Sequence, residues 1–159
     1  MRIYNREKAV AYAQKWALRY NPEFYHFAGI GGDCTNFISQ CLLAGGAPMI
    51  YDKINGWFYK NSYNRSASWT SVKYLQRFLL SEKQFGIVGE IRKIQSLEIG
   101  DLVQLRQKPN TIFNHTLIIT KIVEDEIYVC AHTNNALNKS LSSYEYEETL
   151  GIHILGIKP

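Results

Sequence analysis

Residues 31–46 read GGDCTNFISQCLLAGG, and this stretch decides the expected fold. Glycine pairs stand at both ends, and the segment between them carries apolar residues at helical spacing. We expect a helix over residues 34–44, with Asp33 as its N-cap and Gly45 as its C-cap. The predicted buried face of this helix consists of Phe37, Ile38, Cys41 and Leu42.

Cys34 occupies the first turn of this predicted helix. A helix N-terminus carries partial positive charge and unpaired N–H groups, which favour the thiolate form of a cysteine. The same N–H groups can hold the oxyanion that forms when a thiolate attacks a carbonyl. Glycines in the preceding loop, Gly29, Gly31 and Gly32, allow a substrate backbone to approach closely. By position alone, a nucleophile and a small core residue fit Cys34 about equally.

A nucleophilic cysteine needs a base, and the histidines are the candidates. His115 opens a predicted strand on which it shares a face with Leu117 and Ile119, so its ring would be held firmly. His132 ends the next predicted strand, one hairpin away, where it would orient His115. Asn134, two residues further on, is a second candidate for the orienting group.

The chain outside these motifs divides into a helical first half and a β-rich second half. This order favours an α+β fold in which N-terminal helices pack on a C-terminal antiparallel sheet. We expect one domain over residues 1–159, because this length fits a single core. Helices are predicted over 6–20 and 70–80, and strands over 102–106, 113–122, 126–132 and 150–157.

Composition excludes several classes of protein. The chain is 46% hydrophobic and 20% charged, as expected of a globular protein. The net charge of +4 comes from scattered basic side chains, so we expect no nucleic-acid partner. No apolar run reaches the ~18 residues of a membrane span, and the N-terminus shows no signal-peptide pattern. These features fit a cytoplasmic protein or a domain of a secreted one, and they leave the oligomeric state open.

Residues 51–69 hold six aromatic side chains among polar residues. Such a segment could line a groove that stacks on sugar rings or holds a peptide, although aromatic residues more often pack a core or brace a loop. We count Trp57 and Trp69, together with Asp33 and Asn36, as candidates for substrate or oxyanion contacts. Cys41 and Cys130 fall among apolar residues and are expected to be structural.

Several segments together resemble the putative amidase domain family. They are Tyr4-Asn5-Arg6 with Ala9 and Tyr12-Ala13, the block 32–42 followed by Gly45-Gly46, Trp69-Thr70, and Ile99–Gln104. That family stands with the NlpC/P60 and CHAP amidases in the papain-like superfamily. The resemblance implies a papain-like fold with Cys34 as nucleophile and His115 as base. It also implies a third catalytic residue from the next strand, where His132 ranks before Asn134.

The sequence therefore predicts a cysteine-dependent amide hydrolase that needs no metal and no organic cofactor. A peptide or peptidoglycan-like molecule is the expected substrate, because many proteins of the resembled superfamily act on cell-wall peptides. The alternative is a non-catalytic wall- or peptide-binding module on the same fold. A metal hydrolase built on His115, His132 and Cys130 is disfavoured, because the histidines lie 17 residues apart without an HExxH motif.

Overall fold

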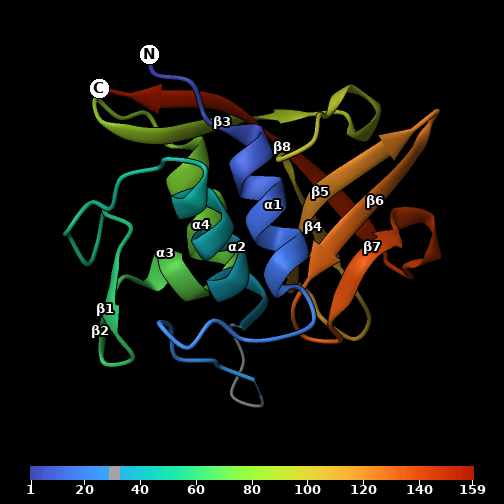
Figure 1. Ribbon diagram of the computed structural model, residues 1–159, viewed down its shortest axis with the longest axis horizontal. Coiled ribbons are helices and arrows are strands. Elements are labelled where there is room, and N and C mark those ends of the chain that lie inside the picture. The colour runs from blue at the N-terminus through green and yellow to red at the C-terminus, as the bar shows by residue number, and fades with distance from the viewer. Residues whose placement is uncertain (29–32) are drawn as a thin grey trace.

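Six strands form one antiparallel sheet in the order β3-β8-β4-β5-β6-β7 (Figure 1). The computed structural model describes residues 1–28 and 33–159 of the chain. The strands of this sheet are β3 (Gly86–Arg92), β4 (Leu102–Arg106), β5 (His115–Val123), β6 (Glu126–Ala131), β7 (Ala136–Ser140) and β8 (Glu148–Lys158). A separate small hairpin pairs β1 (Tyr59–Asn61) with β2 (Asn64–Arg65).

The helices come from the first half of the chain, as the sequence predicts. They are α1 (Arg6–Trp16), α2 (Asp33–Ala44), α3 (Ala67–Thr70) and α4 (Val72–Leu80). The Asn5 side chain caps α1 by accepting the Lys8 N–H at 3.0 Å. The helix expected over 70–80 is α4, which begins two residues later because Ser71 is extended and its side chain caps α4; Thr70 is the last residue of α3.

Helix α2 ends where its glycines predict. Gly46 has a φ of +102°, a left-handed conformation that favours glycine. The N–H groups of Gly46 and Ala47 then return to the carbonyls of Leu43 and Leu42, which satisfies the last turn of the helix. At the other end, the expected glycines 29, 31 and 32 lie outside the described residues.

Two hydrophobic clusters lie on the two faces of the sheet. The first packs Phe37, Ile38 and Leu42 of α2 against Ile118 of β5 and other strand residues. The second contains the alternate strand residues, among them Leu117 and Ile119 of β5. The hairpin β5–β6 therefore separates a face covered by helices from a face covered by the η2 turn (Leu141–Ser143) and Tyr144.

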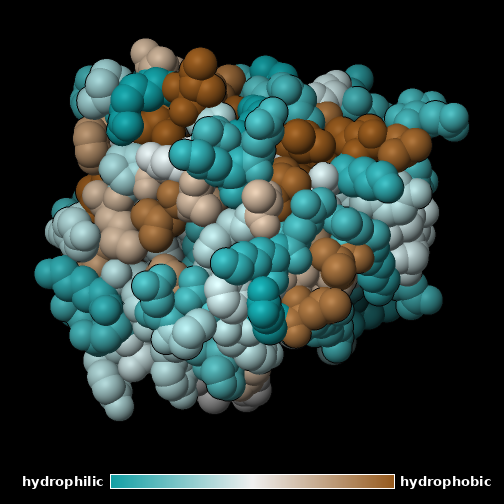
Figure 2. Space-filling view, viewed as in Figure 1, coloured by the Kyte–Doolittle hydropathy of each residue, from teal (hydrophilic) through white to brown (hydrophobic). Residues whose placement is uncertain are grey.

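The surface around this sheet is mixed in character. Figure 2 shows apolar side chains gathered over the far end of the β5–β6 hairpin and near the chain ends, with hydrophilic residues over most of the rest. The two ends of the chain lie together, because Arg2 pairs with Ile157 of β8 (Figure 1). Among the described residues, no helix combines the length and the apolar character required to span a bilayer.

Candidate active site

Cys34 lies in the first turn of α2, where this helix meets the start of β5. Its side chain is buried, with 5% of the residue's surface exposed. The sulfur faces the backbone N–H of Thr116 and lies 3.8 Å from the Thr35 hydroxyl. The Thr35 and Thr116 hydroxyls in turn lie 3.0 Å apart. The nucleophile candidate is thus tied to the residue that follows His115.

The resting state of Cys34 is a thiol. Burial raises the pKa of the Cys34 thiol above its ordinary value, and the hydrogen bonds from Thr116 and Thr35 offset only part of that effect. The helix N-terminus was expected to favour the thiolate, but desolvation is the larger influence here. A nucleophilic role for Cys34 would therefore need a base that takes up the thiol proton.

His115 is the first residue of β5, and it shares a face with Leu117 and Ile119 as expected. Its ring lies 6.2 Å from the Tyr144 ring, between centroids, on the second face of the sheet. Burial, with a smaller contribution from the charge of Lys139, lowers the pKa of His115 to about 4. The imidazole is therefore neutral at pH 7 and able to accept a proton.

The structure brings the backbone of β5 to Cys34 but leaves the two side chains apart. Within residues 1–28 and 33–159, no hydrogen bond joins the Cys34 sulfur to the His115 ring. Thr116 points to the helix-covered face, so the neighbouring His115 points the other way. Rotation of the His115 side chain does not carry it through the sheet, so a contact with the sulfur would require the backbone at the beginning of β5 to rearrange.

His132 is engaged with partners other than His115. It is buried just beyond the end of β6, and its Nδ1 lies 2.7 Å from Oδ2 of Asp33. Its Nε2 lies 2.7 Å from the Trp16 carbonyl oxygen. Neither nitrogen is available to orient His115 in this arrangement. Asn134, the other orienting candidate, is exposed and has a left-handed backbone with a φ of 59°.

Asp33 and Asn36 hold the loop before α2 rather than an open substrate site. Asp33 is the first residue of α2, and its Oδ1 accepts the Phe27 N–H at 2.7 Å and the Asn36 Nδ2 at 3.2 Å. It was expected to cap the helix, but its carboxylate binds the loop and His132 instead. Asn36 also donates to the Tyr25 carbonyl.

Trp57 and Trp69 are wholly buried, so their rings line no groove in this structure. Their ring centroids lie 4.7 Å apart within the first hydrophobic cluster. The indole N–H of Trp57 donates to the Ser39 hydroxyl, and that of Trp69 donates to Oδ1 of Asn36. These contacts support the interpretation that Trp57 and Trp69 of segment 51–69 pack in the core.

A second buried polar cluster was not predicted from the sequence. Asp101 accepts hydrogen bonds from Arg6 at 2.7 Å, from the Ile154 N–H at 2.9 Å and from His153 at 2.8 Å. It joins the start of α1 to β4 and β8. The Asn5-Arg6 and Gly100-Asp101 motifs were visible in the sequence, but their pairing depends on tertiary contacts between residues 95 positions apart.

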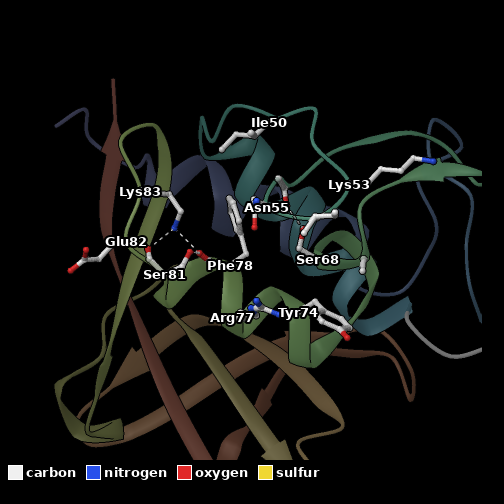
Figure 3. A pocket seen from close by; sticks show the side chains of 13 residues that line it. Ile50, Lys53, Asn55, Ser68, Tyr74, Arg77, Phe78, Ser81, Glu82 and Lys83 are labelled. Atoms are coloured by element: carbon white, nitrogen blue, oxygen red, sulfur yellow. Dashed lines mark hydrogen bonds between the residues drawn. The ribbon is translucent and has the colours of Figure 1, made fainter.

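The cavities of the described chain lie mostly away from Cys34. A pocket of about 300 Å³ opens between residues 50–56 and α4, and Lys83 reaches from its wall to the carbonyls of Phe78 and Ser81 (Figure 3). A shallow depression lies over Asp33 and His132, bordered by Tyr20 and His26. In residues 1–28 and 33–159, no three His, Cys, Asp or Glu side chains gather in a way that would hold a metal ion.

Comparison with known proteins places this architecture in a family. The family model described as "Putative amidase domain" matches residues 3–155. Two curated proteins of Bacillus subtilis (strain 168) are similar, and both are named as uncharacterized. YhbB is 36% identical over 118 residues, which cover 73% of this chain and 37% of YhbB. YjcM is 25% identical over 143 residues, which cover 85% of this chain and 32% of YjcM.

These relatives are longer proteins, and the chain spans about a third of the length of each. No solved structure matches the chain. The family match covers α1, α2 and most of the sheet, including the elements that hold Cys34, His115 and Asp101. The chain thus belongs to the putative amidase domain family.

Proposed function

We propose that this chain is a cysteine-dependent amide hydrolase in which Cys34 is the nucleophile and His115 is the base. Membership of an amidase family suggests hydrolysis in general. The cysteine mechanism is supported by one observation above all, the 3.0 Å contact between the hydroxyls of Thr35 and Thr116, the residues that follow Cys34 and His115. That contact brings a helix N-terminus to the strand on which a neutral histidine is the first residue.

The proposed reaction begins with a rearrangement at the start of β5 that brings the His115 ring from the other face of the sheet to the sulfur. The neutral imidazole takes the thiol proton as the sulfur attacks the substrate carbonyl carbon, and a C–S bond forms. Free N–H groups of the first turn of α2, including that of Cys34, stabilise the oxyanion. The protonated imidazole then donates its proton to the leaving amine, and the C–N bond breaks. Finally His115 takes a proton from a water molecule as the water oxygen attacks the acyl carbon; the C–S bond breaks, the acyl group leaves as a carboxylic acid, and His115 returns the proton to the sulfur.

The proposal makes two more specific claims: the fold is papain-like, and the substrate is a cell-wall peptide. The Gly-Asp-Cys-Thr-Asn-Phe-x-Ser-Gln-Cys block and the packing of α2 on an antiparallel sheet support the fold assignment. A stem peptide or crosslink of peptidoglycan is the first substrate to test, because it presents peptide amides.

A non-catalytic module that binds a wall polymer or a peptide is the second candidate. The burial of Cys34 favours it, because a sulfur with 5% exposure and a raised pKa reacts slowly with an external carbonyl. The two candidates differ in the fate of the bound molecule, which an enzyme shortens and a binding module leaves intact.

Digestion of purified peptidoglycan fragments separates the two functions. The fragments are incubated with the wild type, with Cys34→Ala and with His115→Ala, and the products are read by mass spectrometry. We expect cleaved amides with the wild type and at least 10²-fold less product with either variant. Product from Cys34→Ala equal to that of the wild type would refute the mechanism.

A further inference from the structure

We infer that His132 is a positioning residue that holds the first turn of α2 as a buried cation paired with Asp33, and that it does not orient His115. This inference rests on the proposed function, because the turn that it holds carries Cys34. It differs from the expectation from the sequence, which was that His132 orients the base His115.

The two ring nitrogens of His132 both face oxygen atoms. Nε2 lies 2.7 Å from the carbonyl oxygen of Trp16, the last residue of α1. A carbonyl oxygen only accepts hydrogen bonds, so this nitrogen carries a proton. Nδ1 lies 2.7 Å from Oδ2 of Asp33, a distance typical of a charge-assisted hydrogen bond.

The Asp33 side chain is an ionised carboxylate. Burial on its own would raise the pKa of Asp33, but hydrogen bonds from His132, the Phe27 N–H and Asn36 hold that pKa below its usual value. An ionised carboxylate only accepts, so Nδ1 of His132 also carries a proton. Two protonated nitrogens make the ring an imidazolium.

The surroundings of His132 suit a cation. Its ring stacks on Phe37 with centroids 4.0 Å apart, and the Tyr20 ring meets it edge-on at 5.0 Å. Asp33 from α2 is the anion in contact with it, and the Trp16 carbonyl from α1 adds a negative dipole end. Tyr20 and Tyr25 are the phenols on this side, and His26 stacks on Tyr20 at 4.5 Å rather than on His132 itself.

This ion pair joins three elements at the residue before Cys34. The last residue of α1, the first residue of α2 and the end of β6 all meet at the His132 ring. Loss of the pair frees the first turn of α2 and shifts the sulfur relative to Thr116. Since displacements of about 1 Å can cost 10²-fold in rate, we expect His132→Gln to lower kcat 10- to 100-fold with little change in KM.

His153 provides a matched control. Its Nδ1 lies 2.8 Å from Oδ2 of Asp101, and it is buried to a similar extent, but it lies in β8 within the second polar cluster. His153→Gln therefore removes a comparable His–Asp pair that is not joined to the turn of Cys34. We expect this variant to lose stability and to keep the wild-type kcat when both proteins are fully folded.

The charge state is tested directly by ¹⁵N NMR of histidine-labelled protein, in the wild type and in the inactive Cys34→Ala protein. We expect both ring nitrogens of His132 to carry a proton at pH 7. One unprotonated His132 nitrogen at pH 7 would overturn the inference, as would equal kcat values for His132→Gln and His153→Gln. Because the NMR measurement needs no turnover, it gives its answer even if the proposed amidase activity is refuted.

Discussion

The hydroxyls of Thr35 and Thr116 lie 3.0 Å apart, and each of these threonines directly follows one of the two proposed catalytic residues. This contact joins the first turn of α2 to the start of β5. Because both side chains are buried, the hydrogen bond sets how the nucleophile and the strand of the base face each other.

Replacing these threonines by valine tests the value of that contact. Thr116→Val leaves the buried Thr35 hydroxyl without this partner, so we expect a loss of about 1–3 kcal/mol in the free energy of unfolding. Thr35→Val has a similar effect for the same reason. The double variant removes both polar groups and should cost less than the sum of the single changes. Urea unfolding measures all three, and strictly additive losses would show that the two hydroxyls act independently.

His115 makes the stability of the protein depend on pH. Its pKa of about 4 in the folded protein lies below the value of 6.5 expected in the unfolded chain, so the unfolded state binds more protons between these values. Stability is therefore full above about pH 6.5 and is lost as the pH falls toward 4, by on the order of 3 kcal/mol. His115→Gln should flatten this part of the curve in urea unfolding at stepped pH. An unchanged slope would contradict the buried, neutral imidazole.

The pKa of His115 also predicts how the activity falls on the acid side of the pH profile. Since the base form of His115 persists down to about pH 4, we expect kcat/KM on a peptide amide to hold through pH 6 and to fall only as the pH approaches 4. A midpoint near 6.5 would indicate that the ring is solvated during catalysis.

Asp101 holds the second polar cluster, and its charge should matter for stability. Asp101→Asn leaves the Arg6 guanidinium without its buried carboxylate, so we expect a loss of about 3–5 kcal/mol in the free energy of unfolding. Glu98→Gln is the control, because this side chain is 57% exposed and lies 3.9 Å from Arg6. Its loss should stay below about 1 kcal/mol. Similar losses for the two variants in urea unfolding would contradict this account.

Trp69 tests whether the aromatic segment serves the core or a binding groove. Trp69→Phe removes the indole N–H that donates to Asn36 and leaves a small void, so we expect about 2–4 kcal/mol lower stability. Tyr63→Ala, at a residue with 95% exposure, should change stability by less than about 0.5 kcal/mol. If Trp69→Phe raised KM and left the unfolding curve unchanged, the ring would belong to a substrate groove after all.

Local patterns were sufficient to predict the elements around Cys34. The glycines at 45–46 and the apolar spacing from Phe37 to Leu42 define α2 without any distant contact. The β5–β6 hairpin follows from two β-rich runs, predicted with three residues between them and joined in the structure by two, Glu124 and Asp125. The order of helices before strands predicted an α+β arrangement, and the structure confirms it.

Other elements depend on contacts that no local pattern contains. Strand β7 reads ALNKS and alternates only weakly, because it is an edge strand with one neighbour, β6. Within the described residues, strand β3 pairs only with β8, and the paired residues lie 59 to 72 positions apart in the chain. The expected helix 6–20 ends at Trp16, whose carbonyl binds His132. The hydrogen-bond partners of His132 and Asp101 could not be predicted for the same reason. These bonds join residues far apart in the chain, and no local sequence pattern indicates them.

The central claim is that Cys34 reacts through His115, and selective labelling of the native protein tests it most directly. The folded chain is treated at pH 7 with a peptide-like electrophile, and the site of attachment among Cys34, Cys41 and Cys130 is mapped by mass spectrometry. We predict a single adduct on Cys34 that forms at least ten times more slowly in His115→Ala. Absence of the Cys34 adduct, or equal labelling rates in the wild type and His115→Ala, would contradict the account.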